Sequence, residues 1–371
     1  MGKKLLIVVL VLIVSTLSFT RSFLGLIGDI PWHYGYSDVF NEDRINEELA
    51  KQLPYLERPI EYPLITGFFI YLMWYLGKSL LGYAIFTWIF LTIFAIIAAI
   101  TLYKLCGLLK IGKERIFWFY IFAPSLIVFG VYNWDVIAVM LTVLAVYFFY
   151  NNKHWHSAIF LSLGLNAKLF PVLILPFMLL KTNIKQGVKM FSIFLITSLI
   201  LNLYFIIYGF DVWKITYLFH GLREPNIDSI WSLTNLNTGT VNMLSVVLFL
   251  APYLVLIFFH RKYDLISLSL ASIALFLIVN KIFSPQYILW LLPFFALSQT
   301  MTRKVFYSLE TANLVVFFST SYWIFASKEQ VFWMVSNIFT IVRSLVLIYI
   351  LYSVLVKRQT QESSQNQNLY I

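Results

Sequence analysis

"LGYAIFTWIFLTIFAIIAAITLYKLC", residues 81–106, contains a single charged side chain, that of Lys104. An apolar run longer than about 18 residues is typical of a helix that crosses a membrane. Other runs of the chain are equally apolar. Over its 371 residues the chain is 60% hydrophobic and 12% charged, whereas soluble domains carry about 25% charged residues. The sequence therefore predicts an all-α, polytopic membrane protein.

The composition also excludes several other classes. The net charge of +10 does not indicate nucleic-acid binding, because the Lys and Arg residues fall in short clusters between apolar runs, as the positive-inside rule expects. A transmembrane barrel would show alternating strands of about 10 residues, which the sequence lacks. The one cysteine, Cys106, excludes an internal disulfide and a site of several thiolates for a metal.

The basic clusters predict how the chain crosses the membrane. Fitting spans between them predicts twelve transmembrane helices with both termini in the cytoplasm. The first span resembles a signal peptide, but no clear cleavage site follows it, so a retained helix is favoured. The predicted spans lie near residues 5–25, 81–106, 115–131, 134–150, 156–166, 169–181, 189–209, 239–259, 264–281, 285–299, 304–325 and 330–356.

Two apolar stretches need a separate interpretation. The stretch 62–77 is only about 16 residues long, and counting it as a span would place the basic residues 110–115 outside. It is therefore predicted to be a re-entrant or interfacial helix. The stretch 156–181 is flanked by basic residues on both sides. It is predicted to form two short membrane segments that meet at residues 166–168, with Pro171 near the start of the second.

The loop after the first span is acidic and is expected on the external face. The turns near 133–135, 166–168, 210–238, 281–287 and 326–329 are expected on the same face. Residues 1–358 are predicted to form one membrane domain, and residues 359–371 a disordered cytoplasmic tail. Of the seventeen carboxylates in the chain, eight lie between residues 29 and 61, namely Asp29, Asp38, Glu42, Asp43, Glu47, Glu48, Glu57 and Glu61.

Several motifs of nucleotide chemistry are missing from the sequence. There is no D-x-D pair to hold a metal and a nucleotide sugar, no G-x-G loop and no Walker sequence. Their absence excludes ATP-driven pumps and Rossmann enzymes and disfavours a nucleotide-sugar donor.

Residues 36–68 resemble the first external loop of the GT-C membrane glycosyltransferases. The similarity is greatest to the polyprenol-phosphate-mannose-dependent α-mannosyltransferases of bacteria and archaea. The shared pattern is Asp38 after the first helix, then Pro54-Tyr55, then Glu61-Tyr62-Pro63. Four similar segments follow in order, as far as about residue 300, and the last two predicted helices lie beyond the resemblance. These segments are NWD at 133–135, NAKLFPVLILP at 166–176, HGLREPNIDSIW at 220–231 and NKIFSPQYILWLLP at 280–293.

The resemblance implies transfer of a hexose, mannose in that family, from a polyprenyl-phosphate donor. The implied acceptor is a glycolipid or glycan on the external face of the cell membrane. The donor carries its own leaving group, so a single inverting displacement needs one base for the acceptor hydroxyl and no metal or cofactor. By motif position that base is Asp38. The competing interpretation of Asp38 is a solvated loop acid or a helix N-cap.

The leaving phosphate needs cations or hydrogen-bond donors, because charge develops on it as the glycosidic bond breaks. Lys168 and Lys281 occupy external helix ends among apolar residues, where a cation is costly without a partner. The competing interpretation is that they snorkel to the interface, and Arg223 is alternatively an ordinary loop charge. The candidates for phosphate binding are Lys168, Lys281, Ser284, Gln286 and Arg223.

Five further residues are candidates for substrate binding, each with a structural alternative. Asp29 is a second possible base or a turn residue. Glu61 either binds a substrate or stabilises the short helix that follows it. Asp135 belongs to a site or caps a helix. The last two candidates, His220 and Trp231, stack on a sugar or belong to the aromatic belt of the interface.

Two other functions remain open on the sequence alone. A transporter or flippase for lipid-linked sugars would also place cations at membrane depth and would account for twelve spans. The internal repeat with broken helices that such proteins often show is not found. A membrane scaffold that has lost catalysis is the third possibility.

Overall fold

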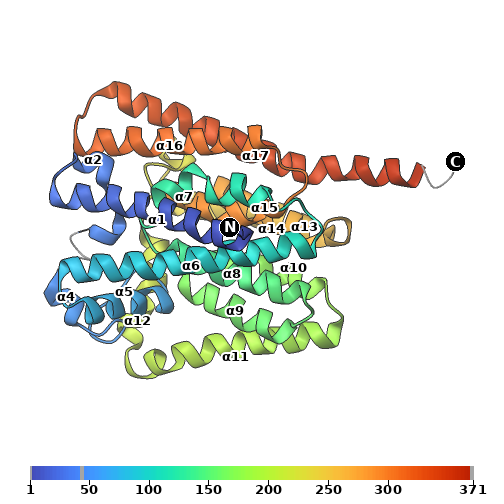
Figure 1. Ribbon diagram of the computed structural model, residues 1–371, viewed down its shortest axis with the longest axis horizontal. Helices are drawn as coiled ribbons and strands as arrows, with labels where there is room; N and C mark the ends of the chain where they lie inside the picture. The colour runs from blue at the N-terminus through green and yellow to red at the C-terminus, as the bar shows by residue number, and fades with distance from the viewer. Residues whose placement is uncertain (1, 42–45, 368–371) are drawn as a thin grey trace.

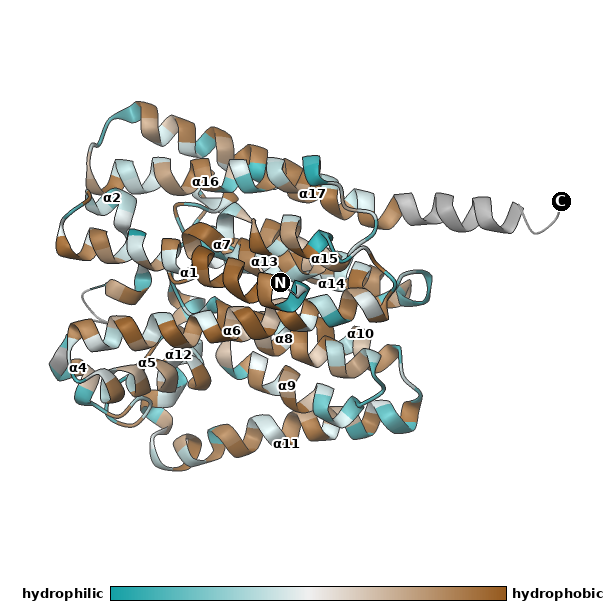
Figure 2. Ribbon diagram, viewed as in Figure 1, coloured by the Kyte–Doolittle hydropathy of each residue, from teal (hydrophilic) through white to brown (hydrophobic). Residues whose placement is uncertain are grey.

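The computed structural model describes residues 2–41 and 46–367, and within these every named element is a helix. Glu42 and Asp43 of the acidic loop lie outside the described residues. The long helices run side by side along the longest axis of the molecule (Figure 1). Hydrophobic residues dominate the helices, and hydrophilic residues gather mainly toward the two ends of the bundle (Figure 2). This distribution is that of a membrane protein.

Five of the described helices are long and apolar enough to cross a membrane. Side-chain caps begin three of them: Ser79, Asn183 and Asn237 each accept a hydrogen bond from a backbone N–H of the first turn, which satisfies a donor that the helix leaves free. The five are α1 (Lys3–Ile27), α6 (Leu80–Leu108), α11 (Ile184–Tyr208), α13 (Thr238–Phe258) and the part Gln330–Val356 of α17 (Gln330–Gln367).

Three of the predicted spans are broken into two short pieces. In each case a proline lies at the start of the second piece, where its missing N–H and its ring prevent the preceding turn from continuing as an α-helix. The pairs are the π-helical turn η2 (Phe117–Ile121) with α7 (Pro124–Phe129), the 3₁₀ turn η3 (Phe170–Ile174) with α10 (Leu175–Leu180), and the 3₁₀ turn η6 (Pro285–Trp290) with α15 (Leu292–Leu297).

The other predicted spans are helices that are shorter or more polar. They are α8 (Asp135–Tyr150), α9 (His154–Ala167), α14 (Leu265–Val279) and α16 (Arg303–Phe325). Each of the twelve predicted segments thus has a helical counterpart, but twelve full-length spans are not confirmed. The sequence also predicts a disordered cytoplasmic tail from residue 359, and this stays a prediction.

The predicted short apolar helix after the acidic loop is present as α5 (Leu64–Gly77). Its 14 residues span about 21 Å, less than the hydrocarbon core of a bilayer at about 30 Å. The Tyr55 hydroxyl fixes its start by donating to the carbonyls of Tyr62 and Pro63 at 2.8 and 2.9 Å. Gly67 makes room for this hydroxyl, since a Cβ there would lie 1.9 Å from it. The place of α5 relative to a membrane stays a prediction.

Short helices gather with α5 at one end of the bundle. The elements α2, α4, α5 and α12 lie at the left of Figure 1, and the connection from α10 to α11 lies at the opposite end. These and the remaining short elements are α2 (Trp32–Gly35), η1 (Asp38–Phe40), α4 (Glu47–Lys51), α12 (Phe210–Leu222), η4 (Ile230–Leu233) and η5 (His260–Lys262).

Candidate functional site

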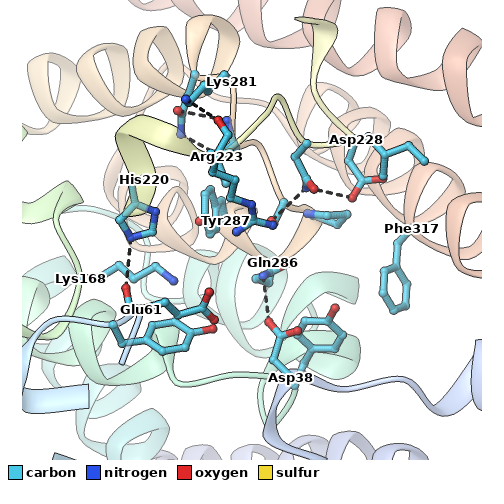
Figure 3. Close-up of a pocket in the computed structure, with 18 of the residues that line it drawn as sticks. Asp38, Glu61, Lys168, His220, Arg223, Asp228, Lys281, Gln286, Tyr287 and Phe317 are labelled. Carbon is cyan, nitrogen blue, oxygen red and sulfur yellow. Dashed lines mark hydrogen bonds between the residues drawn. The ribbon is translucent and has the colours of Figure 1, made fainter. Parts of the chain in front are cut away.

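A cavity of about 610 Å³ collects residues from six separate parts of the chain (Figure 3). Its walls come from the first loop, the turn between α7 and α8, the end of α9, the end of α12 with the loop that follows, the turn between α14 and η6, and the end of α16. Apart from α16, these parts belong to or adjoin segments that the resemblance singles out. The charged or titratable residues among the lining are Asp38, Glu61, Lys168, His220, Arg223, Asp228 and Lys281, with several tyrosines.

Asp38 begins the 3₁₀ turn η1, and its carboxylate faces the cavity. Ser37 fixes this turn, because its hydroxyl accepts from the backbone N–H of Val39 at 3.3 Å and donates to the Tyr132 carbonyl at 2.8 Å. The Tyr36 hydroxyl donates to Oδ1 of Asp38 at 3.2 Å. The Gln286 amide donates to Oδ2 at 3.4 Å. Asp38 is therefore a half-buried carboxylate held in place by one donor from its own loop and one from η6.

Lys168 follows the last residue of α9, and its ammonium pairs with Oδ1 of Asp135 at 2.8 Å. The ammonium also lies over the rings of Tyr62 and Tyr287, 4.8 and 5.0 Å from their centroids. Burial alone would lower the pKa of Lys168, but Asp135, Tyr287 and Asp38 outweigh it and raise this pKa. Lys168 therefore stays a cation at the wall of the cavity.

Asp135 is the partner of Lys168 and is not found among the described residues that line the cavity. Its side chain is 1% exposed. Its backbone N–H is capped by the side chain of Asn133 at 2.9 Å. Asp135 thus neither caps α8 with its own side chain nor faces the cavity, and it acts on the site through Lys168.

Arg223 ends α12 and reaches into the middle of the cavity in Figure 3. No hydrogen bond or ion pair to its guanidinium group is found within the described residues; its nearest aromatic contact is the ring of Phe219 at 5.9 Å. A planar guanidinium can bind a phosphate through two parallel hydrogen bonds. Arg223 is thus the cation of the site that is most available to an anion.

Lys281 is 6% exposed and is already occupied by backbone groups. Its ammonium donates to the carbonyls of Gly221 and Arg223 at 3.0 and 2.5 Å, which the end of α12 leaves without helical partners. The backbone carbonyl of Lys281 accepts in turn from the N–H of Asn226 at 2.8 Å. Lys281 therefore fixes the backbone that carries Arg223, although it also forms part of the cavity wall.

His220 and Glu61 lie together at the same side of the cavity as Lys168 (Figure 3). Nε2 of His220 lies 3.1 Å from the backbone carbonyl of Glu61. Burial lowers the pKa of His220, and the charge of Lys168 lowers it further. A neutral His220 accordingly donates from Nε2 to the Glu61 carbonyl, and this hydrogen bond joins α12 to the first loop.

Besides Asp135, two predicted residues lie away from the cavity. Asp29 is exposed and follows Gly28 at the end of α1. The indole of Trp231 donates to the Val279 carbonyl at 2.7 Å and is 8% exposed. Asp29 is not brought to the other site residues, and Trp231 connects η4 to α14 instead of offering a face for a sugar.

Asp228 is a residue of the site for which sequence reasoning assigned no role. It lines the cavity and is 8% exposed. The Asn226 amide bridges Oδ2 of Asp228 and the Ser284 hydroxyl, at 3.4 and 3.2 Å. Burial raises the pKa of the Asp228 carboxyl to about 6, against the opposing effects of Arg343 and of a hydrogen bond from Thr320. The residue lies within the segment 220–231, but spacing alone does not distinguish it from a solvated loop acid.

The end of α16 forms the remaining wall, from a helix that lies beyond the resemblance. Its contribution is Phe317, Thr320, Ser321, Ile324 and Phe325. These residues recur about one helical turn apart and so share one face. Tyr36 and Tyr132 join this wall, with rings 5.0 Å from Phe325 and 5.6 Å from Phe317 respectively. The face carries no motif by which it could be recognised in the sequence.

No protein-family model matches the chain, and no curated protein matches it either. Among the described residues, no three His, Cys, Asp or Glu side chains gather as metal ligands would. The geometry of the cavity therefore carries the functional argument.

Proposed function

We propose that the protein is a membrane glycosyltransferase of the GT-C type that moves a hexose from a polyprenyl-phosphate donor to a lipid or glycan acceptor. The hexose favoured by the sequence resemblance is mannose. In this proposal the chain crosses the membrane twelve times, both termini are cytoplasmic and the cavity opens on the external face. The observation that carries the proposal is the meeting of Asp38, Lys168 and Arg223, which are far apart in the sequence, in one cavity.

Asp38 suits the role of general base. A base must hold its carboxylate toward the acceptor hydroxyl, and the donors from Tyr36 and Gln286 orient both oxygens of Asp38. The acceptor oxygen forms a bond to the anomeric carbon while the bond from that carbon to the phosphate oxygen breaks. The hydroxyl proton passes to Asp38, and the electron pair leaves with the polyprenyl phosphate. Positioned bases contribute about 10²–10⁴-fold to such reactions.

The cations suit the leaving phosphate to different degrees. The guanidinium of Arg223 forms no hydrogen bond or ion pair within the described residues, so it is proposed as the principal phosphate ligand. Lys168 has given one of its three donors to Asp135 and retains two for an anion. Lys281 is proposed to act through the position of Arg223, and Ser284 and Gln286 supply neutral hydrogen-bonding groups beside the phosphate.

A transfer assay without a gradient tests the proposal. The purified protein in lipid nanodiscs is given labelled polyprenyl-phosphate mannose and a lipid and glycan extract as acceptor, with the glucose donor as comparison. Label should move to the acceptor in the absence of any sealed compartment. A flippase cannot produce this result, because it forms no glycosidic bond. If label stays on the polyprenyl phosphate, while the same protein moves that lipid across sealed vesicles, the transferase proposal is wrong.

A further inference from the structure

The cavity has two chemically different sides. In Figure 3, Lys168, His220 and Glu61 lie at one side with Arg223 toward the middle. Asp38, Asp228 and Phe317 lie at the other side, which we call the carboxylate side. Burial raises the pKa of the Tyr132 hydroxyl, and the charges of Asp38 and, less strongly, Asp228 raise it further. The ring of Tyr132 in turn contacts Phe317.

Two buried acceptor atoms on the carboxylate side meet no described donor at hydrogen-bonding distance and angle, although Thr320 lies beside the Asp228 carboxyl. They are Oδ1 of Asp228 and Oε1 of Gln286. The orientation of the Gln286 amide follows from its neighbour, since the carboxylate of Asp38 requires a donor and receives Nε2. Both residues are more than nine-tenths buried and both line the cavity. Buried polar atoms are nearly always hydrogen-bonded. A ligand that carries hydrogen-bond donors would therefore satisfy these two acceptors.

The charge of Arg343 acts on the Asp228 carboxylate and lowers its pKa, but no salt bridge to this carboxylate is found within the described part of the chain. Arg343 is buried behind it, but its guanidinium donates to the backbone carbonyl of Asp228 and to Asn313. A buried carboxylate without a paired charge is costly, and that cost is reduced when neutral hydroxyl groups donate to it. An anionic ligand would meet Asp38 and Asp228 together, and like charges at close range repel.

We infer that this side of the cavity is the acceptor subsite and that it binds a neutral sugar ring, with hydroxyl groups donating to Asp228 and Gln286 beside the ring of Phe317. The inference rests on the proposed function, because Asp38 as base contacts the acceptor and thereby marks its side of the cavity. A pyranose brings several hydroxyl donors and an apolar face, which matches two free acceptors next to aromatic rings. The acceptor substrate therefore ends in an uncharged sugar.

Equilibrium binding tests the inference without requiring transfer. The wild-type protein is placed in lipid nanodiscs free of sugar-based detergent and titrated with the methyl glycosides of mannose, glucose and galactose. The methyl glycosides of the corresponding uronic acids serve as charged analogues of the same shape. At least one neutral glycoside should bind, and its uronic acid should bind at least about 10-fold more weakly.

Asp228→Asn is the informative variant, since it keeps the shape and removes the charge-assisted acceptor. The affinity for the neutral glycoside should fall roughly 10- to 100-fold, as expected when a hydrogen bond to a charged group is lost. The matched control is Asp211→Asn, which changes an acid of α12 that is 88% exposed and should leave binding unchanged. Donor binding should also be unchanged in Asp228→Asn.

Three results would overturn the inference: no neutral glycoside binds, the uronic acid binds as well as the neutral sugar, or Asp228→Asn binds like the wild type. A loss of donor affinity in place of glycoside affinity would assign the subsite to the donor hexose and equally overturn it. Glycoside binding that depends on Asp228, without any hexose transfer, would leave the sugar subsite standing and refute only the proposed function. Hexose transfer that is unchanged in Asp228→Asn would support the proposed function and refute the sugar subsite.

Discussion

Removing the charge of Lys168 should have two effects that a second substitution can separate. Lys168 and Asp135 form a salt bridge of 2.8 Å with side chains 13% and 1% exposed. Lys168→Gln leaves Asp135 as a buried charge without a partner. Breaking a buried pair in this way costs about 3–5 kcal/mol, so the variant should lose stability as well as donor binding. A loss of activity in Lys168→Gln alone therefore does not identify a phosphate ligand.

The double variant Asp135→Asn/Lys168→Gln separates the two effects. Two neutral amides of similar shape can hydrogen-bond to each other, so the stability should return to within about 1 kcal/mol of the wild type. Donor affinity should stay reduced, because the phosphate has still lost a cation, by roughly 10-fold or more. Stability is measured by SDS titration and donor affinity by equilibrium binding of polyprenyl-phosphate mannose. A double variant that recovers both would show that Lys168 only neutralises Asp135. A single variant as stable as the wild type would refute the salt bridge itself.

Three further predictions follow from the geometry. Arg223→Gln should weaken donor binding roughly 10- to 100-fold at unchanged stability, whereas Lys281→Met should lower both donor affinity and stability, because it leaves the carbonyls of Gly221 and Arg223 without their donor. Donor affinity is measured by titration and stability by SDS titration. Equal effects of the two variants on donor binding and on stability would contradict this prediction. Gly67→Ala should cost on the order of 1–3 kcal/mol, since its Cβ would lie 1.9 Å from the Tyr55 hydroxyl; wild-type stability in the SDS titration would show that the loop can shift freely. The pKa of Asp228 is raised from 3.8 to about 6, so the stability that this shift contributes is present below pH 4 and is lost as the pH rises through about 6. Asp228→Asn should therefore be more stable than the wild type at pH 7.5, on the order of 3 kcal/mol at about 1.4 kcal/mol per pKa unit, with little difference in stability at pH 4. A variant less stable than the wild type at pH 7.5 would contradict this prediction.

The helical architecture could be predicted because apolar length and basic clusters are local properties of the sequence. Breaks at Pro124, Pro176 and Pro293 were not anticipated, since a proline either starts a helix or kinks one and the choice depends on packing. The short helix α5 was anticipated from its length. The contact that fixes the start of α5 could not be predicted, because no sequence pattern shows that Tyr55 packs against Gly67.

The site could be predicted only where a motif marks it. Asp38, Lys168 and Arg223 lie in marked segments and do meet in the cavity. Trp231 is equally marked but binds a backbone carbonyl, and a sequence cannot tell which way an indole points. The role of Asp228 and the wall from α16 were missed because burial beside a cavity is a property of the folded chain.

The measurement that tests the central claim most directly is hexose transfer by Asp38→Asn, compared with Asp29→Asn. The amide keeps the shape of Asp38 but cannot accept the proton, so transfer should fall by about 10²–10⁴-fold, while donor binding and stability are retained. Asp29 is exposed and away from the cavity, so Asp29→Asn should transfer like the wild type. Near-normal transfer by Asp38→Asn, with donor and acceptor both bound, would contradict the account.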